Sequence, residues 1–338
     1  MFYHGCYWLS LFNAIYYTQL KLSIIDALFE SMSGITTTGA TVLNNLDELP
    51  KGILIWRALL QWLGGIGIVV IALVILPFLR IGGMQLFHLE GDDPYDKFLP
   101  KISSVVMKIV IAYCALTTVL LFLYYINGMT LFDAIAHSFT TISTGGFSTH
   151  NDSFAYFQSN SILNIAIIFM IIGSIPFLLL AQTSYKNNAL FKDHQVRVLI
   201  FILISAIALI FYFARPYVDG SILHQLTSIS FNTISIISGT GYVSANFEEW
   251  GNYASVLFLL LMFIGGCAGS TTGGLKVFRF QILFQYIHLH LKKMLQPHMV
   301  LSAKFNGKKV PDSTYESVMT FFFVYIVTFA SSALLLSF

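Results

Sequence analysis

Long apolar stretches alternate along the chain with shorter, half-polar segments. Seven stretches reach the roughly 20 residues that a membrane-spanning helix needs, and they lie near 3–20, 52–79, 103–127, 160–184, 196–215, 252–290 and 315–338. Three segments of about a dozen residues are too short to cross, and they cover 24–36, 130–142 and 222–237. Short helices of this kind occur at membrane depth where they stop halfway inside protein. The pattern predicts an all-α polytopic membrane protein with repeated units of span, re-entrant helix, extended loop and span.

A short motif follows each of the three half-polar segments. The copies align without gaps on Gly39, Gly146 and Gly241. Isoleucine stands four residues before each glycine, serine or threonine eight before it, and asparagine five after it. A helix followed by a Thr/Gly-rich loop between two spans is the design of cation filters, in which backbone carbonyls replace the water around the ion. We predict a selectivity filter formed by Thr37, Thr38, Gly39, Thr144, Gly145, Gly146, Gly239, Thr240 and Gly241.

The chemistry of this candidate filter follows from the residues around it. No charged residue lies between Glu30 and Asp47, so selectivity must come from carbonyls and hydroxyls. The re-entrant helices would direct their C-terminal ends, which carry a partial negative charge, towards the ion. Each loop offers one aligned glycine rather than a Gly-Tyr-Gly sequence. We therefore expect fewer tight ion sites, and weaker discrimination, than in a tetrameric potassium channel.

A glycine-rich segment interrupts the stretch at 252–290. Five glycines lie between Gly265 and Gly274, and each costs about 1 kcal/mol relative to alanine in a helix. Non-helical backbone at this depth must be buried in protein or line water. A phosphate-binding loop is excluded because Leu275 stands where the lysine is required. We predict a movable gate under the filter, formed by Gly265, Gly266, Gly269, Ser270, Thr271, Thr272, Gly273 and Gly274.

Composition and charge agree with this assignment. Apolar residues make up 56% of the chain and charged residues only 10%, which excludes an ordinary soluble domain. Fourteen of the 18 basic residues fall within 80–108, 186–197 and 276–309, which the positive-inside rule places in the cytoplasm. The filter loops then open to the outside. We expect no enzyme activity, no cofactor and no nucleic-acid partner; K⁺ at the filter is the only metal ion expected.

Several polar residues have structural interpretations. Asp26 and Asp133 lie near the starts of the first two re-entrant helices, where they suit helix caps better than ion ligands. His137 is expected to form a local hydrogen bond. Arg57 and Gln61, at the outer end of the second span, could hold a pore loop by hydrogen bonds.

These motifs, taken together and in order, resemble the Trk/Ktr/HKT superfamily, and specifically the Trk-type membrane subunit of potassium transporters. The resemblance rests on SGITTTGATVLNNLDELPKGILIWRALLQWLGGIGIVV from Ser33, GGMQLF at 82–87, STGGFSTHND at 143–152, SGTGY at 238–242 and GGCAGSTTGGLKVFR at 265–279. It implies potassium uptake across the cell inner membrane and four membrane-pore-membrane repeats around a pseudo-fourfold pore. It further implies a homodimer and a cytosolic nucleotide-binding regulatory subunit.

The repeats divide the chain into four expected units. They are a first pore repeat at 1–80, a second at 81–185, a third with a broken last helix at 186–295, and a linker with the first helix of an incomplete fourth at 296–338. The spacing of the glycines places a fourth filter beyond Phe338, so we expect a C-terminally truncated chain. Two alternatives remain: a non-conducting fragment, or the potassium-translocating subunit of a pump complex.

Overall fold

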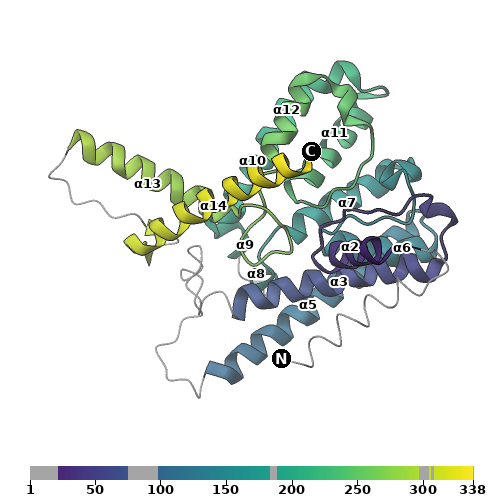
Figure 1. The fold of residues 1–338 in the computed structure, drawn as a ribbon, viewed down its shortest axis with the longest axis horizontal. Helices are drawn as coiled ribbons and strands as arrows, with labels where there is room; N and C mark the ends of the chain where they lie inside the picture. The colour runs from purple at the N-terminus through teal and green to yellow at the C-terminus, as the bar shows by residue number, and fades with distance from the viewer. Residues whose placement is uncertain (1–21, 75–97, 183–188, 297–303, 306–307, 338) are drawn as a thin grey trace.

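The computed structural model describes residues 22–74, 98–182, 189–296, 304–305 and 308–337, and it is all-α apart from one short hairpin (Figure 1). The helices are α2 (Ile24–Ile35), α3 (Lys51–Val74), α5 (Phe98–Ile126), α6 (Leu131–Ile142), α7 (Asn160–Gly173), α8 (Phe177–Gln182), α9 (Ala189–Lys192), α10 (His194–Ala214), α11 (Ile222–Ile237), α12 (Asn252–Leu261), α13 (Val277–Leu295) and α14 (Asp312–Leu336). Short 3₁₀ helices are η1 (Leu46–Glu48), η4 (Ser153–Phe157), η5 (Arg215–Tyr217) and η6 (Phe247–Trp250). The hairpin pairs β1 (Lys304–Phe305) with β2 (Lys308–Lys309).

Some sequence predictions fall outside the described residues. They are the span at 3–20, the last part of the span at 52–79, and the GGMQLF motif at 82–87.

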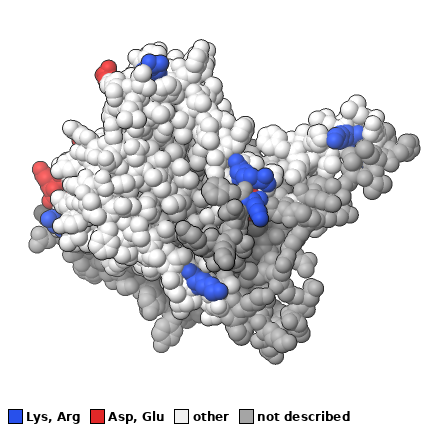
Figure 2. Space-filling model, turned by 180° about the vertical axis from the view of Figure 1, so that it is seen from behind, with Lys and Arg blue, Asp and Glu red and all other residues white. Residues whose placement is uncertain are grey.

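Four described helices are long and apolar enough to cross a membrane. The qualifying stretches are Lys51–Ile71, Ser103–Ile126, His194–Tyr217 and Ser313–Leu336, and each coincides with a predicted span. Figure 2 shows a face of the molecule on which charged atoms are sparse over the described surface. Such a surface suits contact with lipid, as expected for a polytopic membrane protein.

The three re-entrant helices form where the sequence predicts them, as α2, α6 and α11. Each begins at a hydroxyl N-cap, Ser23, Thr130 or Ser221, whose side chain accepts a hydrogen bond from a backbone N–H three residues later. Asp26 and Asp133 accept hydrogen bonds from the first two caps, which confirms their expected capping role. Local side-chain chemistry therefore fixes where all three helices begin.

Two predicted spans are broken in the structure. The break in 252–290, between α12 and α13, is at the glycine-rich segment, as predicted. The continuous span predicted at 160–184 is wrong, because α7 ends at Gly173 and α8 begins at Phe177. Pro176 explains the break, since proline lacks an N–H and disfavours helical backbone at the residue before it. The break exposes carbonyl groups that the glycine-rich segment uses.

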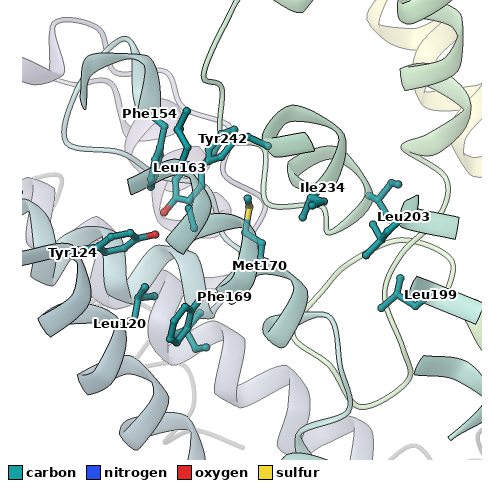
Figure 3. Close-up of a cluster of buried hydrophobic side chains, with 14 of the residues drawn as sticks. Leu120, Tyr124, Phe154, Leu163, Phe169, Met170, Leu199, Leu203, Ile234 and Tyr242 are labelled. Atoms are coloured by element: carbon teal, nitrogen blue, oxygen red, sulfur yellow. The ribbon is translucent and has the colours of Figure 1, made fainter. Parts of the chain in front are cut away.

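The largest buried apolar cluster of the described residues draws mainly on α5, α7, α10 and α11 and includes Tyr242 of the third loop (Figure 3). The rings of Phe154 and Tyr242 lie 4.3 Å apart. The Tyr242 hydroxyl is 2.5 Å from Thr140 Oγ1 and 3.1 Å from Thr141 Oγ1. The Tyr124 hydroxyl, from α5, is 3.0 Å from the same Thr141 oxygen. Buried hydroxyl contacts thus lock the second re-entrant helix to its neighbours on both sides.

Candidate functional site

The three re-entrant helices end in the same way. After α2, Thr37 N donates to Gly34 O (3.1 Å) and Thr38 N to Ser33 O (2.9 Å). This pair of bonds is the Schellman motif, in which the residue after the C-cap adopts a left-handed conformation. The same pair recurs after α6 (Thr144 to Thr141, Gly145 to Thr140) and after α11 (Gly239 to Ile236, Thr240 to Ser235). Three helices with different sequences therefore enter their loops along the same backbone path.

The aligned glycines share one conformation as well. Gly39, Gly146 and Gly241 have φ angles of +81°, +83° and +82°. This region strongly favours glycine, because a Cβ clashes with the backbone there. The backbone angles thus agree with the ungapped sequence alignment at the central position of each loop.

Most carbonyl groups of the candidate filter have no hydrogen-bond partner among the described residues. Of the nine predicted filter residues, only Gly145 accepts a hydrogen bond on its carbonyl from the described residues, from Gln61 Nε2 at 2.7 Å. Buried carbonyls are normally paired with protein or water. Unpaired carbonyls following three helix C-termini could therefore replace the water around a cation.

Neighbouring loops touch in sequence order. A Cβ built on Gly39 would lie 2.3 Å from Gly145 O, and one on Gly146 would lie 1.8 Å from Thr240 O. Gly39 and Gly146 thus each lie against the residue that comes just before the central glycine of the next loop. A Cβ on Gly241 would meet no described atom within 4 Å. The first, second and third loops are arranged side by side, and the far side of the third is open within the described residues.

Glycines in the flanking helices allow the re-entrant helices to approach. A Cβ on Gly64, in α3, would lie 2.0 Å from Ile35 O, at the end of α2. A Cβ on Gly173, at the end of α7, would lie 2.9 Å from Thr144 Cγ2 and 3.3 Å from Ile142 O. The sequence reasoning did not single out these two positions. Isolated glycines inside spanning helices were the available signal.

Gln61 from α3 holds the second loop at two points. Its Nε2 donates to Gly145 O, and its Oε1 accepts from Phe147 N at 3.0 Å. The side chain is fully buried. This amide therefore fills the space beside Gly145, where a Cβ would lie 2.4 Å from Gln61 Oε1. The role expected for Gln61 as a loop anchor is confirmed.

Arg57 forms a buried ion pair behind the first and second loops. Its Nε lies 2.7 Å from Glu30 Oε1, and both side chains are excluded from solvent. The same guanidinium donates to Thr41 Oγ1 (3.1 Å), and it lies 4.0 Å from the centre of the Phe147 ring. Thr41 follows the first central glycine and Phe147 follows the second. Arg57 thus connects the two loops to α2 through Glu30, as an interfacial pair and not as an ion ligand.

A second connection lies at the outer ends of these loops. His150 Nδ1 is 2.5 Å from Asp47 Oδ1, and the His150 ring stacks on Tyr156. Asn151 donates to Asp47 through its side chain and its backbone N–H. The hydrogen bond from His150 is the main cause that holds the pKa of Asp47 below its ordinary value. His137 contacts Asp133 O and Ser148 Oγ, which confirms its expected local hydrogen bonding.

The glycine-rich segment folds into a compact, mostly buried loop. Its ends meet where Gly265 N donates to Leu275 O (2.8 Å), and a Cβ on Gly265 would lie 2.1 Å from Gly273 O. Only Gly273 and Gly274 are exposed among the residues predicted to form the gate. Gly269 and Gly274 have positive φ angles, which requires glycine or a strained residue.

This segment docks on the break between α7 and α8. Thr271 N donates to Gly173 O (3.2 Å), Cys267 N donates to Ser174 O (2.9 Å), and Phe177 N donates to Gly269 O (2.9 Å). A Cβ on Gly266 would lie 2.8 Å from Ser174 O. The two broken spans therefore satisfy each other's backbone groups, as membrane burial requires.

Two contacts connect the glycine-rich segment to the candidate filter. Thr271 Oγ1 lies 3.2 Å from Thr144 Oγ1, in the second loop. A Cβ on Gly239, in the third loop, would lie 3.7 Å from Gly273 N. Lys276 directs its Nζ to Ser270 Oγ (3.4 Å), Thr272 Oγ1 (3.0 Å) and Thr272 O. The segment thus lies at the base of two loops, with a lysine holding its own turn.

The described residues contain no group of three or more His, Cys, Asp or Glu side chains that could hold a metal ion. The backbone and hydroxyl oxygens of the loops are the remaining groups suited to a monovalent cation. Such an ion would be cargo rather than a resident cofactor.

Comparison with known proteins gives concordant results. The family model of TrkH, described as a cation transport protein, matches residues 8–337. The Trk system potassium uptake protein TrkI of Halomonas elongata is 38% identical over 319 residues, which cover 94% of this chain and 65% of the relative. The Trk system potassium uptake protein TrkH of Escherichia coli K12 is 40% identical over 323 residues, which cover 93% of this chain and 66% of the relative.

A solved structure agrees at the level of fold. The crystal structure of the potassium transporter TrkH from Vibrio parahaemolyticus matches with a TM-score of 0.84 and 36% identity, over 96% of this chain and 69% of that chain. This chain thus spans about two thirds of the length of its relatives. With four described helices long and apolar enough to cross a membrane, it is a multi-pass membrane protein. From its sequence and its fold alike, the chain belongs to the TrkH family of cation transport proteins.

Proposed function

We propose that this chain forms the filter-bearing part of a potassium uptake pathway across the cytoplasmic membrane. The observation that carries the proposal is the threefold recurrence of one backbone path, a Schellman helix end followed by a glycine near φ +82°. Recurrence at three independent sites is what a common ligand, shared by all three loops, would require. The names of the relatives, potassium uptake proteins, supply the ion.

The chemistry of the loops suits a large monovalent cation. The candidate ligands are the carbonyls of Thr37, Gly39 and their equivalents, which accept no hydrogen bonds from the described residues. Each helix that leads into a loop adds about half a negative charge at its C-terminal end. These neutral oxygens attract a cation without holding it as tightly as a ring of carboxylates would. Weak, multiple binding is what passage through a filter needs.

The glycine-rich segment is the proposed gate. It is non-helical backbone at the base of the second and third loops, and it is mostly buried by hydrogen bonds to the broken span α7–α8. Those bonds can be exchanged for others if the segment moves. A helix in its place could not bend without losing hydrogen bonds between its own backbone groups. Opening would then require the segment to leave Gly173 and Ser174.

The assembly follows from the same family membership. We propose a homodimer whose cytoplasmic side binds a nucleotide-binding regulatory subunit, with lipid around the apolar helices. Within the chain, we propose pore repeats at 1–80, 81–185 and 186–295, followed by a linker and helix at 296–338 that open a fourth unit.

The test is potassium flux in vesicles that contain the purified protein and no nucleotide. We expect K⁺ to enter down its gradient, and Gly146→Asp to abolish this flux. Gly67→Ala is the matched control, because a Cβ at Gly67 meets nothing within 4 Å. If correctly folded protein gives no flux without an added ATPase, the pump-subunit alternative replaces the proposal. If it gives none under any condition, the chain is non-conducting.

A further inference from the structure

Thr144, in the second loop, is a threonine in a conformation that threonine avoids. Its φ angle is +50°, in the left-handed region, where a β-branched side chain is a genuine outlier. The residue is only 2% exposed, so contact with solvent does not stabilise this conformation. The equivalent residues are Thr37 in the first loop, with φ +56°, and Gly239 in the third, so the conformation belongs to the shared helix end. Such strain persists only where the surroundings demand it, and it commonly marks a functional position.

At Thr144 the hydroxyl group of this helix-end residue reaches a distant segment of the chain. Thr144 Oγ1 donates to the oxygen of Thr271, in the glycine-rich segment, at 3.2 Å and also lies 2.8 Å from Ser143 O. Valine would fill the same volume without either bond. The hydroxyl is therefore the feature that distinguishes Thr144 from an apolar residue at this position.

Thr271 is the centre of a wider set of contacts. Its Oγ1 lies 3.2 Å from Ile142 O, at the end of α6, and 3.1 Å from Gly173 O, at the end of α7. Its backbone N–H donates to the same Gly173 carbonyl. The side chain is 2% exposed. One hydroxyl thus connects the glycine-rich segment, the end of a re-entrant helix and the second loop.

We propose that Thr271 is a positioning residue that couples the gate to the ion selectivity of the second loop. When the segment moves, Thr271 leaves Thr144 and Ile142 O, and the second loop loses the contact that holds its strained residue. By the reciprocity of coupled equilibria, an ion bound at the second loop also shifts the position of the segment. This inference rests on the proposed function, and it makes gate and selector one coupled unit rather than two separate elements.

The other two loops lack this connection among the described residues. The Thr37 hydroxyl bonds to Thr36 O, within its own loop. Gly239 has no side chain. The coupling therefore acts through the second loop, the one between the other two.

Two adjacent threonines provide a matched experiment. Thr271→Val removes the hydroxyl that contacts the filter loop. Thr272→Val removes a hydroxyl whose partners, among the residues that the structure describes, are Gly266 N and Ser270 in the segment and Lys276 just after it. Both changes keep the side-chain volume. Thr271→Ser keeps the hydroxyl and should behave as the wild type if the bond, and not the methyl group, matters.

The measurement is the K⁺/Na⁺ permeability ratio in vesicles, normalised to folded protein. We expect Thr271→Val to lower the ratio about threefold to tenfold, the size of one or two lost hydrogen bonds. Thr144→Val should act similarly, and the double variant should lose no more than either alone. Thr272→Val should change the flux but keep the ratio within about twofold. An unchanged ratio in Thr271→Val, or losses that multiply in the double variant, would overturn the proposal.

A second readout separates this inference from the proposed function. Amide hydrogen exchange at Gly145 and Gly146 does not depend on transport. Thr271→Val should speed that exchange, and Thr272→Val should not. If the wild-type protein transports no K⁺, the proposed function fails while this exchange pattern still supports the coupling. Equal exchange in both variants would refute it.

Discussion

The second and third candidate filter loops have the same backbone but are held in different ways. Gln61 and Arg57, both on α3, hold the second loop from outside, and the first and third loops lie on its two sides. The third loop is held by its own helix, α11, where Ser235 Oγ donates to Tyr242 O and Asn232 bonds to Ser244. It is also held by α6, where Thr140 and Thr141 contact the Tyr242 hydroxyl. One conformation is thus reached with different tertiary partners: α3 and the glycine-rich segment for the second loop, and α6 for the third.

This difference predicts where each loop is sensitive. The second loop should respond to changes in α3 and in the glycine-rich segment, which lie far away in sequence. The third should respond to changes within α11 and α6, and less to changes in α3. The residue just before the central glycine differs between the two loops. It is Gly145 in the second loop, where Gln61 occupies the space that a side chain would need, and Thr240 in the third.

The largest effect is expected from the buried ion pair. Arg57→Met leaves Glu30 buried and charged without its partner, which should destabilise the fold by about 3–5 kcal/mol. Adding Glu30→Gln should recover much of that loss. Arg215→Met is the control on the side of the third loop, because Arg215 is exposed and only approaches the Phe211 ring. Thermal unfolding in detergent measures all three, and equal losses in Arg57→Met and Arg215→Met would show that the pair is not structural.

The next effect concerns the central glycine of the second loop. Gly146→Ala places a Cβ 1.8 Å from Thr240 O in a residue with φ +83°. The neighbouring backbone must shift, so the K⁺/Na⁺ permeability ratio should fall at least about tenfold. Gly145→Ala should lower it less, because its Cβ meets a side chain, Gln61, that can move. Equal losses at the two positions would contradict the alignment of the loops.

A smaller effect tests whether Gln61 is what excludes a side chain at position 145. Gly145→Ala should cost about 1–3 kcal/mol of stability through overpacking against Gln61. Gln61→Ala alone loses two hydrogen bonds but opens the space. In the double variant the overpacking cost should vanish, so the two losses should not add. Additive losses in thermal unfolding would mean that another contact restricts position 145.

The smallest effect is expected at the outer connection. The pKa of Asp47 is held below its ordinary 3.8 mainly by the hydrogen bond from His150. A carboxylate with a lowered folded-state pKa stabilises the fold above its ordinary pKa, and that contribution is lost as the pH falls through the lowered value. Asp47→Asn should therefore flatten the acid limb of the stability profile slightly, and Glu48→Gln, on an exposed neighbour, should not. Identical acid limbs in Asp47→Asn and the wild type would show that Asp47 does not contribute to the pH dependence of stability.

The sequence predicted those parts of the structure that local chemistry determines. The half-polar segments and the aligned glycines that follow them lie close together in sequence, so α2, α6 and α11 could be placed closely. The break after Gly173 was missed, although Pro176 marks it, because long apolar runs were interpreted as continuous. The contact between Thr144 and Thr271 could not be predicted, since 127 residues separate the two hydroxyls and only the fold brings them together.

The proposed function requires the carbonyls of the aligned glycines to bind the transported ion. The most direct measurement is anomalous X-ray scattering from crystals of the protein grown with Rb⁺ in place of K⁺. We expect a peak within direct ligand distance of the Gly39, Gly146 and Gly241 carbonyls, and loss of that peak in Gly146→Ala. The protein could instead transport Rb⁺ and show its peak only elsewhere, such as beside the carboxylates outside the loops. That result would show that the glycine carbonyls do not bind the transported ion.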